Sequence, residues 1–279
     1  MNKNTLIGAV ALFALLPSAQ SYAICSSGTA CPSGSSWFHE LRPVPLFSST
    51  PLDVSGNDLI YLGVLRASTP MMAACVNVAG TPTLYRIDDA NDGAGINFSA
   101  LKAESFFCAG PGNDTVSVLR STYKCGAFTM DPFPYNGYAL HIYGQAGRDY
   151  VYGGDGVDII CGGDGSDVLY GYGGVDDLDG WTGCDYINGG AGADFALGYD
   201  QADWLVETDP AGHALGENHN YDCLDVYSTV ADADCGPGYD GVEVFSSSNH
   251  SNCEYQAYCP WDYPAHAHAM CADFPANGP

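Results

Sequence analysis

The sequence predicts an all-β protein built from short strands that recur at a fixed spacing. A block of nine residues occurs seven times without interruption between Gly144 and Val206. Each block ends in an x-apolar-x run, which is typical of a very short strand with its middle side chain pointing inward. Residues 24–142 show further strand-like runs separated by Pro and Gly, and no sustained helical periodicity.

The start of the chain, over 1–23, predicts a signal peptide. Lys3 supplies positive charge, Leu6–Leu16 is apolar, and Ser21–Ala23 forms a small-x-small cleavage site. The apolar run is too short to span a bilayer as a helix, and no later stretch reaches that length. We therefore expect a protein exported by this signal peptide, secreted or held at the cell surface, with no membrane span once the signal peptide is removed. An uncleaved N-terminal membrane anchor is the alternative.

Residues 24–142 predict an irregular β-rich region. Its strand-like runs are Leu59–Leu65, Thr115–Leu119 and Ala139–Tyr143. The region lacks a continuous repeat, although parts of it resemble degenerate copies of the nine-residue block.

All twelve cysteines lie after the predicted cleavage site. An even number of cysteines in an exported chain indicates disulfides formed in an oxidising compartment. No Cys-x-x-Cys pair occurs, so zinc-ribbon and thioredoxin-type sites have little support. Spacing alone leaves the pairing open.

The chain is strongly acidic, with 33 Asp and Glu against 8 Lys and Arg and a net charge of −25. Loss of Lys3 with the signal peptide makes the mature chain more negative still. Such a surface repels phosphate backbones, which excludes nucleic acid as a partner. Disorder is disfavoured because 19 Tyr, 11 Phe and 4 Trp supply core material. So many carboxylates in a folded chain therefore indicate a bound cation that balances part of their charge.

Four columns of the repeat stay in phase across residues 143–206. Position 1 is Gly in every block, and position 4 is Gly in all but one, where Gln201 stands. Position 6 is always aspartate: Asp149, Asp158, Asp167, Asp176, Asp185, Asp194 and Asp203. Position 8 is always apolar: Val151, Ile160, Leu169, Leu178, Ile187, Ala196 and Leu205.

Each column has a physical role. Glycine permits positive φ and a close approach of backbone carbonyls to an ion. The aspartate stands at the end of the turn, where its carboxylate can meet a cation, and hard oxygen ligands favour calcium over zinc or copper. A Gly-rich linker would not keep an aspartate and an apolar residue in phase seven times. These seven aspartates are therefore the predicted calcium ligands.

This pattern resembles the repeats-in-toxin (RTX) calcium-binding repeat, GGxGxDxUx. The resemblance implies a right-handed parallel β-roll, or β-solenoid, in which two blocks make one coil and calcium lies between successive turns. One edge would then stack Asp149, Asp167, Asp185 and Asp203, and the other Asp158, Asp176 and Asp194. It implies about five calcium ions in the regular array, which we expect to fold only when calcium binds.

Degenerate copies flank the array. Asp114 and Asp240 occupy the aspartate column of two further matches, and Asp222 precedes Asp240 by the length of two blocks. Asp58 is a fainter match that ordinary turn chemistry explains equally well. Whether these four aspartates bind calcium is open. We expect degenerate coils over 207–243 and a Cys-rich C-terminal cap over 244–279, so that irregular, disulfide-linked coils flank the regular ones.

The outward positions of alternate blocks are unusually aromatic. They hold Tyr150, Tyr152, Val168, Tyr170, Tyr186, Asn188, Trp204 and Val206. Such a face either packs within the chain, which we favour, or forms a partner surface.

The sequence offers no catalytic signature, and we predict that the chain is not an enzyme. It contains no Gly-x-Ser-x-Gly motif, and His39-Glu40 lacks the second histidine of a zinc protease helix, because Pro43 stands there. We expect a calcium-binding protein with a structural, adhesive, cell-surface or matrix role. The alternatives are a secreted hydrolase with its active site in residues 24–142, and a self-assembling fibre subunit. The N-terminal signal and the many cysteines depart from typical RTX proteins, which disfavours a toxin function.

Overall fold

The computed structural model describes residues 39–43, 56–66, 71–78, 81–89, 105–133, 139–209, 211–217, 222–226, 232–237, 241–244, 249–253 and 255–256. The predicted signal peptide, Asp240 and residues 257–279 lie outside this part of the chain. All regular elements within it are strands. Accordingly, none of the described segments is a long apolar helix of the kind that crosses a membrane.

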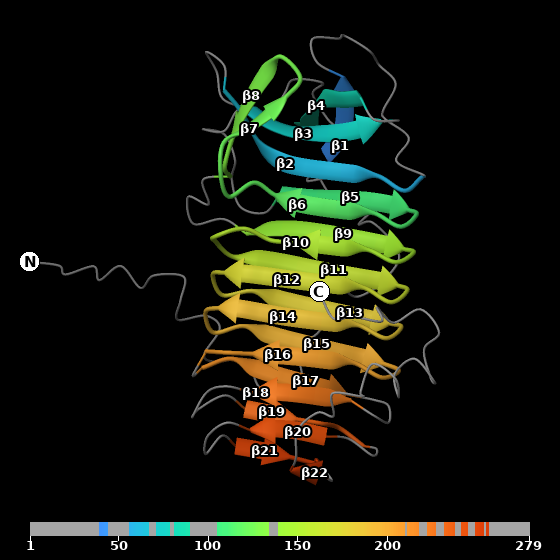
Figure 1. Ribbon diagram of the computed structural model, residues 1–279, viewed down its shortest axis with the longest axis vertical. Coiled ribbons are helices and arrows are strands. Elements are labelled where there is room, and N and C mark those ends of the chain that lie inside the picture. The colour runs from blue at the N-terminus through green and yellow to red at the C-terminus, as the bar shows by residue number, and fades with distance from the viewer. Residues whose placement is uncertain are drawn as a thin grey trace, which may run out of the picture.

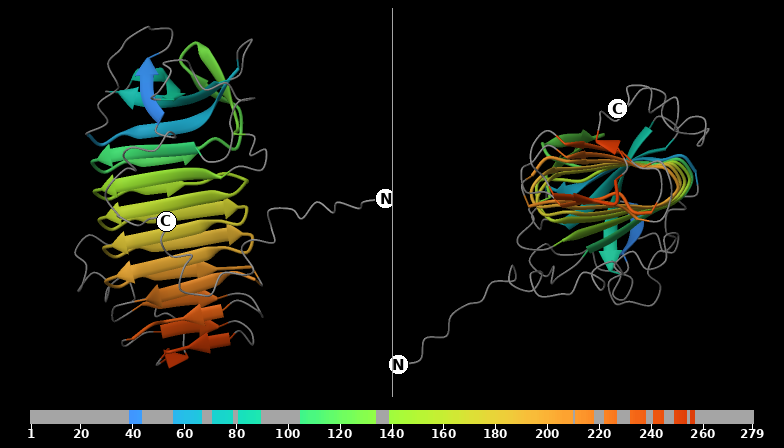
Figure 2. Two further views of the ribbon diagram at one scale, coloured as in Figure 1. Left: turned by 180° about the vertical axis from the view of Figure 1, so that it is seen from behind. Right: turned by 90° about the horizontal axis from the view of Figure 1, so that it is seen from below.

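The strands form a parallel β-solenoid whose coils stack along one axis, with a sheet on each of two opposite sides (Figures 1 and 2). This confirms the predicted fold class. The larger sheet contains β2 (Leu59–Leu65), β6 (Thr115–Val118), β10 (Tyr150–Tyr152), β12 (Val168–Gly173), β14 (Tyr186–Ala191), β16 (Trp204–Glu207), β18 (Cys223–Val226), β20 (Gly241–Val244) and β22 (Tyr255–Gln256) in spatial order. The smaller contains β5 (Ser105–Pro111), β9 (Leu140–Ala146), β11 (Asp158–Asp164), β13 (Asp177–Thr182), β15 (Phe195–Asp200), β17 (His213–Glu217), β19 (Asp232–Asp234) and β21 (Asn249–Ser251).

Parallel pairing extends beyond the seven regular blocks on both sides. The strand-like run at Leu59–Leu65 is β2, which pairs in parallel with β6, and β6 pairs with β10. Beyond residue 206, β16 pairs with β18, and β18 with β20. The regular blocks are therefore the middle of a longer solenoid.

A row of inward side chains fills the space between the two sheets. The seven apolar residues at position 8 all have zero exposed surface, as the alternation predicts. The same column continues through Val116 and Leu224 in one sheet and Ile142 and Ala214 in the other. Large aliphatic side chains in the middle coils give way to alanine in later coils of the smaller sheet. One continuous hydrophobic cluster joins all of them.

The N-terminal end of the solenoid has antiparallel strands that the sequence did not predict. β1 (His39–Pro43), β4 (Thr81–Asp89) and β3 (Met71–Val78) extend the larger sheet in that order onto β2, and β7 (Tyr123–Cys125) pairs with β8 (Phe128–Asp131). A separate hydrophobic cluster joins β3, β4, β7 and β8 and includes Ala73, Leu84 and Met130. The Cys75–Cys125 disulfide links β3 to β7. These strands cover the first coil, whose core edge would otherwise be open.

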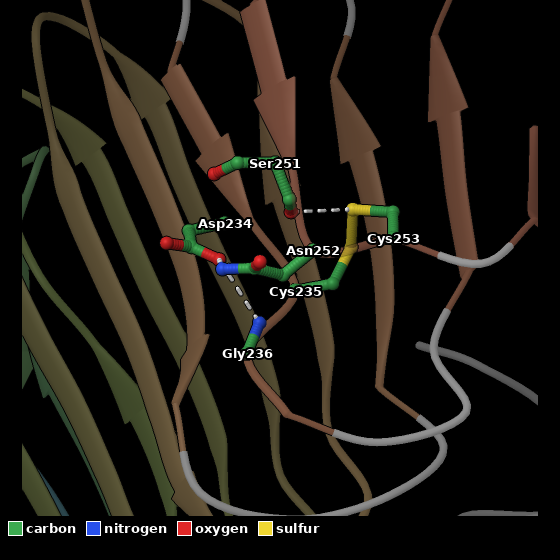
Figure 3. Close-up of a disulfide and its surroundings, with 6 residues drawn as sticks. All are labelled: Asp234, Cys235, Gly236, Ser251, Asn252 and Cys253. Atoms are coloured by element: carbon green, nitrogen blue, oxygen red, sulfur yellow. Dashed lines mark hydrogen bonds between the residues drawn. A yellow bond between two sulfur atoms is a disulfide. The ribbon is translucent and has the colours of Figure 1, made fainter.

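A second disulfide joins two successive coils near the other end. Cys235 and Cys253 are 18 residues apart, one coil, and their Cα atoms are separated by 5.2 Å. Asp234 supports the same turn, because its Oδ1 accepts hydrogen bonds from the backbone N–H of Gly236 and from Nδ2 of Asn252 (Figure 3). Cys108, Cys161, Cys184 and Cys223 are disulfide-bonded as well. The expected bracing of irregular coils by disulfides is thus present.

Candidate calcium sites

The predicted aspartates form two rows, one along each edge of the solenoid. The strand registers stack Asp149, Asp167, Asp185 and Asp203 on the edge that leads into the larger sheet, which we call row one. They stack Asp158, Asp176 and Asp194 on the opposite edge, which we call row two. This is the arrangement that the RTX resemblance implies. All seven residues are buried, with at most 1% of their surface exposed.

Within each row, one carboxylate oxygen is already committed to the fold. The aspartate one coil further along accepts, through its Oδ1, the backbone N–H of Asp149, Asp158, Asp167, Asp176 and Asp185, at 2.7–2.9 Å. The aspartate carbonyl meanwhile accepts from the first strand residue of the next coil, as Asp167 does from Tyr186 N–H at 2.9 Å. Each aspartate is therefore fixed in position by the coils on either side of it.

The second carboxylate oxygen, Oδ2, has no hydrogen-bond partner in five of the row aspartates. Oδ2 is buried and accepts no hydrogen bond in Asp149, Asp167, Asp176, Asp185 and Asp194. A buried charged oxygen without a partner is costly, since burial removes its hydration. A cation that binds Oδ2 removes that cost.

The glycine at position 1 makes room for this oxygen and brings a second one beside it. An ideal Cβ placed on Gly153 would lie 2.8 Å from Oδ2 of Asp158 and 2.7 Å from the carbonyl oxygen of Gly171, one coil away. A Cβ at Gly162 likewise meets Oδ2 of Asp167 and the carbonyl oxygen of Gly180. Any side chain at position 1 would therefore collide with the aspartate of its own turn. Carboxylate and carbonyl oxygens from adjacent coils converge at the same place.

The backbone of a turn is strained where a residue other than glycine stands at position 2 or position 4. Tyr172, Trp181 and Tyr199 occupy position 2 with φ between 71° and 81°, and Gln201 occupies position 4 with φ of 85°. Non-glycine residues at such angles cost about 1–3 kcal/mol each and persist only where surrounding structure enforces them. The stacked turns impose this geometry because their backbone groups bond directly, as Gly165 N–H does to Thr182 O at 2.7 Å.

Burial raises the pKa of six of the seven row aspartates: Asp149, Asp167, Asp176, Asp185, Asp194 and Asp203. It raises the pKa of Asp149 to about 7, of Asp176 to about 8 and of Asp185 to about 8. The pKa of Asp167 is also raised well above its ordinary value, first by burial and then by the charge of Asp185. Without a cation, the rows therefore resist ionisation at neutral pH.

The donor set fits calcium. All candidate donors are oxygens, and hard oxygen ligands in a flexible shell are what calcium prefers. Among the described residues, no three His, Cys, Asp or Glu side chains gather into a metal cluster. An ion between coils would thus take one or two carboxylates and complete its shell with backbone carbonyls. The ion pairs Arg66–Asp131 and Arg120–Asp155 involve exposed carboxylates outside the rows.

Row one continues past the regular array in both directions. The N–H of Asp58 donates to Oδ1 of Asp114, and the N–H of Asp114 to Oδ1 of Asp149. At the other end, the N–H of Asp203 donates to Oδ1 of Asp222 across 19 residues. The extra residue lies between Glu217 and Asp222, because Tyr199 still pairs with Glu217 in the regular register. The structure thus places Asp58, Asp114 and Asp222 in the row, while Asp240 lies outside the described residues.

Comparison with known proteins agrees with this geometry. The family model for RTX calcium-binding nonapeptide repeats, four copies long, matches residues 141–169, 162–185 and 182–206. The chain carries RTX calcium-binding repeats. No curated protein and no solved structure matches it. The RTX match ends at residue 206, whereas row one of the structure runs from Asp58 to Asp222. The RTX array is therefore embedded in a longer solenoid with the same edge geometry.

The outer face of the RTX coils is lined with stacked rings on the larger sheet. Tyr152 stacks on Tyr170 with ring centroids 5.4 Å apart, and Tyr186 meets Trp204 edge-on at 5.5 Å. Val168 has no exposed surface although it points away from the core, whereas Tyr170 and Trp204 are partly exposed. The rings therefore cover one another along the solenoid axis and bury the aliphatic residue between them.

Proposed function

We propose that this chain is an exported structural protein whose solenoid folds when calcium fills its two carboxylate rows, and that it acts as a rigid, acidic element at a cell surface or in a matrix. The observation that carries the proposal is the pair of buried rows, in which Oδ2 has no hydrogen-bond partner in five aspartates: Asp149, Asp167, Asp176, Asp185 and Asp194. These carboxylates stabilise the fold only when a cation neutralises them. Extracellular calcium supplies that cation after export, which suits a protein with an N-terminal signal peptide.

Two features support a structural role: the way the coils use their residues, and the lack of hydrolase motifs in the sequence. The interior of the coils is filled by aliphatic packing and their edges by the predicted calcium sites. The sequence contains neither the nucleophile motif nor the zinc motif of the hydrolases that carry RTX repeats.

A cell-retention experiment tests the structural role. We expect the full chain to stay on the producing cell in the presence of calcium and to be released by chelator. Calcium-dependent turnover in a broad hydrolase screen would contradict the proposal, and filaments in negative stain would favour the fibre subunit.

Substituting Asp185 tests the calcium role at the centre of row one. Asp185→Asn keeps an oxygen that accepts the Asp167 N–H but removes the charge between two coils. We expect the calcium midpoint for folding to rise about tenfold or more. Losing one charged ligand should cost at least as much as losing a hydrogen bond to a charged group, about 1.5–3 kcal/mol, and about 1.4 kcal/mol corresponds to tenfold. In chelator the same variant should be no less stable than wild type, since asparagine removes the cost of burying or protonating the Asp185 carboxylate. Asp131→Asn, which removes an exposed carboxylate outside the rows, is the matched control for a circular dichroism titration.

The aromatic face has its own test. Tyr170 packs against Tyr152, Tyr172 and Tyr186, so we expect the double variant Tyr170→Ser/Tyr186→Ser to lose about 2 kcal/mol or more of unfolding free energy in calcium. Denaturant titration at fixed calcium measures this. An unchanged midpoint combined with loss of cell retention or self-association would instead assign the face to a partner.

A further inference from the structure

The aspartates of row two end at Asp194, because the next coil has no aspartate in the column. Phe195 pairs with His213, which puts Gly212 where an aspartate would stand. The block that begins two block lengths after Gly189 starts with Glu207, where every regular block has glycine. In this one block, the acid and the glycine have exchanged positions 6 and 1.

The exchange leaves a carboxylate in the same place, attached from the opposite side of the turn. In regular blocks, the aspartate carboxylate lies against the bare Cα at position 1. Here the Glu207 carboxylate lies against the bare Cα of Gly212, and an ideal Cβ on Gly212 would overlap Cδ of Glu207. The two departures from the pattern depend on each other, since an aspartate at 212 and a glutamate at 207 could not both fit.

Glu207 is as deeply enclosed as the aspartates and has an oxygen to spare. Its exposed surface is zero, its Oε1 accepts the N–H of Asp209 at 2.7 Å, and its Oε2 is buried with no hydrogen-bond partner. An ideal Cβ on Gly189 would lie 2.6 Å from Oδ2 of Asp194 and 2.9 Å from Oε2 of Glu207. The carbonyl oxygen of the next position-1 residue fills that place in the regular coils. Two unpartnered carboxylate oxygens from adjacent coils therefore face the same spot.

We propose that Glu207 is a calcium ligand that closes a further site on row two, between the turn of Asp194 and the turn of Glu207. This inference rests on the proposed calcium function of the rows. The site adds one ion to the about five expected for the regular array. Because it presents two carboxylates rather than one carboxylate and one carbonyl, it carries more negative charge than a regular site and favours a divalent cation more strongly.

The test compares calcium stoichiometry across matched variants of the full chain, measured by native mass spectrometry with calcium alone as the probe. Glu207→Gln is expected to bind one ion fewer than wild type while the other sites remain. The double variant Glu207→Gly/Gly212→Asp restores the regular pattern and should restore the ion. Asp131→Asn, an exposed acid outside the rows, should retain every ion.

Each outcome either supports or overturns the assignment of Glu207 as a calcium ligand. Equal stoichiometry for Glu207→Gln and Asp131→Asn overturns the assignment. If Glu207→Gln fails to fold, the double variant is compared with Glu207→Gly/Gly212→Asn, which keeps the same shape without the charge. One ion fewer in the asparagine variant supports a carboxylate ligand at this place, and equal stoichiometry overturns it. A wild-type chain that binds no calcium would defeat the proposed function itself, a result distinct from loss of a single ion.

Discussion

Excess chelator at neutral pH should remove most of the β-structure of the coils while leaving the antiparallel strands at the N-terminal end, β1, β3, β4, β7 and β8, folded; these strands are called the cap below. Stacked strands lie about 4.8 Å apart, and two carboxylates at that distance repel by roughly 3–4 kcal/mol at an effective dielectric of 20. Row one holds such neighbours over its whole length, so each coil adds either the cost of this repulsion or the cost of binding protons to avoid it. Few domains have a net stability large enough to absorb several such pairs. A divalent ion between coils turns each repulsion into an attraction.

The cap should respond differently because its stability has another source. β3 pairs with both β2 and β4, a separate hydrophobic cluster contains Ala73, Leu84 and Met130, and the Cys75–Cys125 disulfide ties β3 to β7. Hydrogen exchange in chelator should therefore show rapid exchange over β10–β16 and retained protection over β3 and β4. Readdition of calcium should restore protection, and an equal concentration of magnesium should not, since magnesium demands a tighter octahedral shell. Unchanged circular dichroism in excess chelator would contradict a calcium-dependent fold.

The regular coils could be predicted from sequence because every constraint on them is local. Gly at position 1, Asp at position 6 and an apolar residue at position 8 act within one turn, and the next coil repeats them in register. Asp114 and Asp222 could be recognised for the same reason, and the structure stacks both in row one. Asp58 could not be separated from ordinary turn chemistry, because its place in the row depends on Asp114, which lies 56 residues away.

Two features do not follow from the nine-residue pattern. The antiparallel cap depends on pairings such as His39 with Asp89, which no spacing rule links. Glu207 was missed because its block fails the pattern twice, at positions 1 and 6, and each failure alone argues against a site. The signal was the combination: an acid in the glycine column and a glycine in the aspartate column of one block. In a stacked coil, a carboxylate can reach one location from either of two attachment points.

Acidification should replace calcium in part, and this prediction follows from the direction of the pKa shifts. Burial raises the pKa of Asp149 to about 7, of Asp185 to about 8 and of Glu207 to about 8 in the folded chain. In the unfolded chain, these groups have pKa values of about 4. The folded state therefore holds protons that the unfolded state releases. The stability of the calcium-free fold is greatest below about pH 4 and is lost as the pH rises from there through the folded-state pKa values of about 7 to 8.

We accordingly expect β-structure in chelator to increase as the pH is lowered from about 8 to about 5, above the sequence pI of about 4.1 where solubility falls. With calcium present the sign reverses, because protons compete for Oδ2, so the calcium midpoint should rise over the same interval. High salt separates this effect from relief of the overall negative charge, since salt screens exposed charges far more than buried ones. An increase in β-structure at low pH that persists in high salt would indicate that protonation of the buried rows causes it. A calcium-free chain whose circular dichroism stays flat from pH 8 to 5 would mean that the buried carboxylates do not limit folding.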